Sequence, residues 1–109
     1  MTDISFLTNY LEQRYGKRFS NAYLWFQDNK GRISELTVEK GEVPSISASV
    51  KGDTGTYPVY IGPEGFWCRC QSMTSTKSPC KHVFSLLLYC YTEGLINEEE
   101  TYNLIGRWE

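Results

Sequence analysis

The sequence lacks the features of membrane-spanning, secreted and strongly basic chains. No apolar run approaches the roughly 18 residues of a membrane span, and the longest candidate, Val83 to Tyr91, is too short. The N-terminus has neither the basic stretch nor the apolar stretch of a secretory signal peptide. The net charge of −2 gives no overall basic character of the kind that dedicated nucleic-acid-binding domains carry. We therefore expect an intracellular, soluble protein, cytoplasmic or, in a eukaryote, nuclear, with no membrane partner and no small-molecule substrate.

Histidine is also scarce: it occurs once, and three of the four cysteines lie close to it. Cys-Arg-Cys occupies positions 68–70, nine residues follow, and Cys-Lys-His occupies positions 80–82. Zn²⁺ takes tetrahedral sulfur and nitrogen ligands, and a Cys₃His set fills all four positions with protein atoms. A filled coordination shell leaves no place for a catalytic water, so we expect a binding module and not an enzyme. The predicted ligands of one structural Zn²⁺ are Cys68, Cys70, Cys80 and His82.

Two disulfides are the alternative use of four cysteines. Zinc is favoured because no export signal is evident, and because Cys68 and Cys70 are too close to bridge each other without strain. Disulfides would also leave His82 unused at an ordinary ligand spacing. Cys90, two helical turns later, is interpreted as a small buried residue of a helix.

Positive charge is concentrated around the predicted metal site. Three basic residues and no acidic residue lie in 65–92, so this segment carries +3 and the rest of the chain carries −5. These residues are Arg69, Lys77 and Lys81. They are either solvated side chains or a small basic surface for a partner.

Hydrophobic spacing predicts an α+β fold. Residues 3–15 form an amphipathic helix, with Asp3 as a candidate N-cap and Gly16 as its stop. Alternating patterns separated by turn residues then predict an antiparallel β-meander. Its predicted strands are Ala22–Gln27, Arg32–Glu39, Ile46–Val50, Thr56–Ile61 and Phe66–Cys70.

Two further helices follow the meander. Pro79–Tyr91 is apolar around most of its circumference, which predicts burial on more than one side. Ser78 is its candidate N-cap, with Pro79 at the first helical position. Asn97 and the three glutamates after it predict the start of a short C-terminal helix, because a cap and acidic residues complement the positive end of a helix.

The ligand spacing can be reconciled with these elements. Side chains two residues apart on a strand share a face, so Cys68 and Cys70 can reach one ion while Trp67 and Arg69 point the other way. Residues two apart in a helix lie about 200° apart. The cysteine at position 80 should therefore lie at the helix entrance, with the histidine in the first turn. We expect the histidine nitrogen that does not bind zinc to donate to a backbone carbonyl or a similar acceptor.

Beyond the ligands, residues 56–92 resemble the SWIM zinc-finger family. The resemblance is carried by Tyr-Pro-Val-Tyr-Ile at 57–61, the turn at 62–65, Phe-Trp-Cys-Arg-Cys at 66–70, and Ser-Pro-Cys-Lys-His-Val-Phe at 78–84, followed by leucines. It implies a ββα zinc unit. At 109 residues, the chain is expected to form a single domain, 1–109. Residues 1–55 would add the N-terminal helix and strands, and 95–109 the C-terminal helix.

The resemblance also implies a function. SWIM modules bind DNA or proteins, and a short chain with no ATPase phosphate loop and no nuclease carboxylates most resembles the recombination accessory members. It implies a protein-interaction adaptor in DNA repair or recombination, with a RecA-family ATPase as the partner. Trp67 is the best exposed candidate for an interface anchor, because aromatic residues are enriched at interface hot spots. The alternative is weak, direct DNA or RNA binding by Arg69, Lys77 and Lys81, with Trp67 stacking on a base.

Overall fold

The computed structural model describes residues 4–28, 32–53, 55–70 and 79–108. The fold is α+β, as predicted, and the four strands within these ranges form one antiparallel meander in the order β1-β2-β3-β4. The elements are α1 (Ser5–Tyr15), α2 (Lys17–Asp28), β1 (Ile33–Glu39), β2 (Ser45–Lys51), β3 (Thr56–Gly62), β4 (Gly65–Cys68), α4 (Lys81–Thr92) and α5 (Glu98–Gly106).

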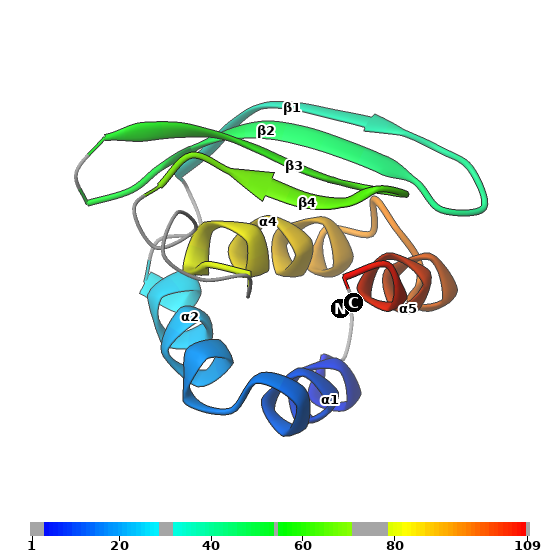
Figure 1. Ribbon diagram of the computed structural model, residues 1–109, viewed down its shortest axis with the longest axis horizontal. Helices are drawn as coiled ribbons and strands as arrows, with labels where there is room; N and C mark the ends of the chain where they lie inside the picture. The colour runs from blue at the N-terminus through cyan, green and yellow to red at the C-terminus, as the bar shows by residue number, and fades with distance from the viewer. Residues whose placement is uncertain (1–3, 29–31, 54, 71–78, 109) are drawn as a thin grey trace.

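Helix α4 occupies the centre of the fold. Figure 1 shows it lying against one face of the sheet, with α1, α2 and α5 arranged around its other sides. Every side chain from His82 to Leu88 is buried, which confirms the predicted burial on more than one side. On the sheet, Ile46, Ala48 and Val50 face the core, while the serines between them lie on the other face. None of the helices in the described ranges is both long enough and apolar enough to cross a membrane.

The predicted strand Ala22–Gln27 is wrong, because this segment lies within α2. Helix α1 ends at Gly16, as predicted, where φ is 60. The chain then turns directly into a second helix. The buried residues of α2 are Phe19, Ala22 and Phe26, spaced by three and four residues as on one face of a helix. Aromatic residues are enriched in strands, and that composition outweighed the helical spacing in the sequence-based prediction.

Two predicted helix starts also change. Helix α1 begins at Ser5 behind Ile4, and Asp3 lies outside the described residues. Helix α4 has Cys80 as its N-cap, so Pro79 precedes the helix instead of opening it. Ser78, the predicted cap, lies outside the described residues. The carbonyl of Cys80 accepts the first intrahelical hydrogen bond, from the amide of Phe84.

The predicted cap of α5 is confirmed and forms a capping box. The Asn97 side chain accepts from the Glu100 amide at 2.7 Å, and the Glu100 carboxylate accepts from the Asn97 amide at 2.9 Å. Lys40 Nζ donates to the same carboxylate at 2.8 Å, which lowers the pKa of Glu100 and ties α5 to the residue after β1.

Replacing the capping residue should destabilise the fold without touching the metal site. We expect Asn97→Ala to lower the free energy of unfolding by about 1 kcal/mol, because one amide of the first turn of α5 loses its acceptor. Urea denaturation measures the loss. The control is Asn9→Ala at an exposed position of α1, where we expect a change within about 0.5 kcal/mol. Equal effects of the two substitutions would contradict the role of the cap.

Candidate metal centre

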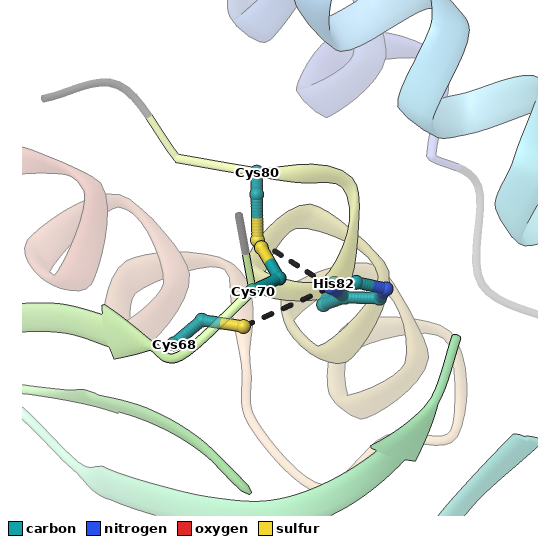
Figure 2. Close-up of side chains that lie close together, drawn as sticks. All are labelled: Cys68, Cys70, Cys80 and His82. Carbon is teal, nitrogen blue, oxygen red and sulfur yellow. Dashed lines mark hydrogen bonds between the residues drawn. The ribbon is translucent and has the colours of Figure 1, made fainter. Parts of the chain in front are cut away.

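The four predicted ligands meet between the end of β4 and the start of α4. Cys68 is the last residue of β4, Cys80 is the N-cap of α4, and His82 is the second residue of that helix. Cys70 lies two residues beyond β4, which ends earlier than predicted, and it still reaches the cluster. All four side chains are buried, and their ligand atoms lie within 4.8 Å of one another (Figure 2).

The interatomic distances suit donors that share one ion. Nδ1 of His82 lies 3.7 Å from Sγ of Cys68 and 3.7 Å from Sγ of Cys80. A tetrahedral zinc with Zn–S bonds of about 2.3 Å and a Zn–N bond of about 2.0–2.1 Å separates its sulfur and nitrogen donors by about 3.6 Å. The cluster could therefore hold a single metal ion with little rearrangement.

Neighbouring elements hold the ligand-bearing segments in place. Arg18 on α2 donates through Nε to the carbonyl of Pro79 at 2.7 Å, directly before Cys80. Val59 of β3 pairs with Cys68, so the meander fixes the other side of the site. The Cys₃His cluster thus lies between the sheet and the central helix, at the end where α2 packs.

The thiols are electrostatically coupled. Burial alone raises the pKa of Cys90, which lies outside the cluster, to about 12. Within the cluster, the hydrogen bond to Cys80 and burial raise the pKa of Cys68. The hydrogen bond from Cys68 is the main reason why the pKa of Cys80 falls to about 4, despite its burial. A divalent cation between the sulfurs would stabilise them as thiolates.

The ring of His82 lies among aromatic residues. Trp25 of α2 meets it edge to face with ring centroids 5.4 Å apart, and Tyr57 of β3 lies 5.3 Å away. The predicted acceptor for the second ring nitrogen is not found: Nε2 is buried and has no hydrogen-bond partner in the part of the chain that the structure describes.

The residues predicted to contact a partner lie in different surroundings. Trp67 is 45% exposed, on the opposite face of the sheet from Cys68, as predicted. The guanidinium of Arg69 lies 5.0 Å from the centroid of the Trp67 ring. Lys81 instead binds Asp53, with Nζ 2.6 Å from Oδ2, and lies 5.0 Å from the Trp25 ring centroid. Lys77 lies outside the described residues.

Asp53 is a residue that the sequence analysis missed. Its carboxylate accepts from Lys81 and from Nε1 of Trp25, at 3.5 Å, and lies 3.7 Å from Arg32. The hydrogen bond from Lys81 is the main cause of its lowered pKa. No local signal in the sequence could have revealed this network, because its members come from α2, from the residue before β1, from the turn after β2 and from the start of α4.

Comparison with protein-family models, with curated proteins and with solved structures finds no match to this chain. The interpretation of the site is therefore based on its donor atoms and their geometry.

Metal removal should unfold the protein. Structural zinc sites in zinc-finger peptides contribute roughly 10–16 kcal/mol of folding free energy. We expect one metal ion per chain by elemental analysis, and loss of the cooperative thermal transition after chelation or in Cys68→Ala. The matched control is Cys90→Ala, which makes the same change at a buried cysteine outside the cluster and should keep the metal. A metal-free wild-type protein with an unchanged Tm would contradict the assignment.

Proposed function

We propose that this chain is a binding module of the SWIM type, stabilised by one structural Zn²⁺. The observation that carries the proposal is the buried Cys₃His cluster, whose sulfur–nitrogen distances of 3.7 Å suit a shared ion. Zinc is the metal that best suits three thiolates and one imidazole in tetrahedral geometry. The order of β3, β4 and α4 supports the ββα unit that the resemblance implies for residues 56–92.

A structural role follows from the number of donors. Catalytic zinc sites keep one position for water or substrate, whereas closed structural sites are filled by four protein ligands. This cluster supplies four donor atoms, and all four of the residues that carry them are buried. We therefore assign the metal to stability and propose that the protein is not an enzyme.

The proposed activity is that of a protein-interaction adaptor. Trp67 supports it, because a large aromatic side chain that is 45% exposed on a sheet face is typical of an interface anchor. The resemblance to SWIM modules supplies the proposed setting, which is DNA repair or recombination with a RecA-family ATPase as the partner.

Direct nucleic-acid binding is the second candidate, and the pairing of Trp67 with Arg69 favours it. A base could stack on the indole ring while the guanidinium contacts the backbone. Lys81 contributes less than the sequence predicted, because Asp53 already neutralises its charge. The protein-partner proposal is preferred, since the basic surface of the described residues around the site is small.

Removing the exposed tryptophan tests the adaptor proposal. We expect Trp67→Ala to lose at least tenfold in affinity for the partner recovered by affinity purification from the source cells, because interface anchors contribute about 2 kcal/mol or more. Leu24→Ala is the control, since Leu24 is 61% exposed on α2, away from the sheet. Metal content should stay at the wild-type value in both variants. Retention of every partner by Trp67→Ala would remove this residue from the interface.

Titration with single-stranded DNA tests the alternative. If nucleic acid binds, affinity should be weak and should fall steeply with salt, because bound counterions are released. Arg69→Ala should weaken binding more than Lys81→Ala, since Lys81 is paired with Asp53. Lys17→Ala, at an exposed position of α2, serves as a charge-matched control. Tight binding that persists in both Arg69→Ala and Lys81→Ala would show that this surface is not the one used.

A further inference from the structure

His82 presents one particular nitrogen to the cysteines. Nδ1 lies 3.7 Å from two of the three sulfur atoms, and Figure 2 shows the second ring nitrogen on the far side of the ring from them. Nδ1 is bonded directly to Cγ, the ring carbon attached to Cβ, whereas Nε2 is one bond further from the backbone. A metal bound at Nδ1 therefore lies close to the helix. This short reach suits a histidine in the first turn, two residues after the cysteine that caps the same helix.

The far side of the ring is closed by Gly52. A Cβ atom added at this glycine would lie 2.5 Å from Nε2 of His82, closer than Cβ atoms approach other heavy atoms, and 3.2 Å from Cε1, which is tighter than most Cβ contacts. It would also lie 3.3 Å from Cε2 of Tyr57. The ring thus rests directly on the backbone at position 52, and any side chain there would push it toward the sulfurs.

The backbone conformation of Gly52 does not itself require glycine. Its φ lies outside the left-handed region, in contrast to Gly16, Gly55, Gly65 and Gly94. A φ outside that region is open to residues with a Cβ. The need for glycine therefore comes from the space that the imidazole ring takes up.

Aromatic walls complete the enclosure. Trp25 meets the ring of His82 at an interplanar angle of 82°, and Tyr57 lies at 31° to it. With the glycine behind and the two aromatic rings beside it, the imidazole has little freedom to turn. In metal sites, a neighbouring carboxylate, carbonyl or water usually orients a ligating histidine through a hydrogen bond to its other nitrogen. Here, in the described part of the chain, packing takes that role, because Nε2 has no hydrogen-bond partner.

We propose that His82 binds the metal through Nδ1 and that Gly52 is the positioning residue that sets this coordination by leaving room for the ring. The inference rests on the proposed zinc site. It adds a residue outside the Cys₃His pattern to the determinants of metal affinity. It also identifies the ligating atom, which the spacing of the motif leaves open.

The central test is Gly52→Ala in the full chain. We expect zinc affinity, measured by competition with a chromogenic chelator, to fall roughly 10–100-fold, as when other residues that orient a metal ligand are replaced. Gly41→Ala is the matched control: its φ also lies outside the left-handed region, and an added Cβ would make only an ordinary contact of 3.7 Å with a carbonyl oxygen. Equal zinc affinities of the two variants would overturn the role of Gly52.

A double substitution separates positioning from general destabilisation. In a His82→Cys background the ring is gone, and a Cys₄ set is also a common structural zinc site. Adding Gly52→Ala there should change zinc affinity less than twofold, because the added methyl group has no ligating imidazole to displace. This comparison holds even if Gly52→Ala alone fails to fold. A loss of zinc affinity in the His82→Cys background as large as in the wild type would show that the glycine serves the turn and not the ligand.

The ligating atom can be observed directly. A long-range ¹H–¹⁵N spectrum of the zinc-loaded wild type distinguishes a metal-bound Nδ1, with the proton on Nε2, from the opposite arrangement. We expect the Nδ1-bound form, and an Nε2-bound form would overturn the inference while leaving the zinc site intact. A wild-type protein that binds no zinc would overturn the proposed function itself, so the two failures are distinguishable.

Discussion

The structure depends on the close approach of three thiols and an imidazole in the buried interior. Their ligand atoms lie within 4.8 Å of one another, and several buried thiolates at such distances repel each other unless a cation lies between them. The same four residues lie at the end of β4, just after it, and at the start of α4. Helix α4 is the element on which the sheet and the other helices pack. A single bound ion would therefore fix the junction that sets the central helix against the sheet.

Local signals predicted the parts of the fold that depend on nearby residues. The gathering of the three cysteines and the histidine, the buried helix after them and the Asn97 cap were predictable, because each follows from spacing over a few positions. The second helix was missed because its aromatic composition favours strands. The pairing of Lys81 with Asp53 and the packing of His82 on Gly52 could not be predicted either. Both contacts join segments about thirty positions apart, and tertiary structure alone brings such segments together.

Side chains along 67–70 alternate between the candidate metal site and the outer surface. Cys68 and Cys70 point into the core. Trp67, before them, and Arg69, between them, point to solvent. The residues that would hold the ion therefore also fix the backbone that carries the exposed tryptophan. In the proposed adaptor, metal loading would order the contact surface together with the core, and the interface would need no further support of its own.

The edge-to-face contact between Trp25 and His82 has a practical consequence. Indole emission responds to the charge and to the electronic state of an adjoining imidazole, and the ring centroids here are 5.4 Å apart. Of the three tryptophans, Trp67 lies on the opposite face of the sheet and Trp108 packs against Phe66 and Phe84. The protein thus contains an intrinsic fluorophore beside the candidate ligand, and occupancy of the site can be followed in real time without an attached dye.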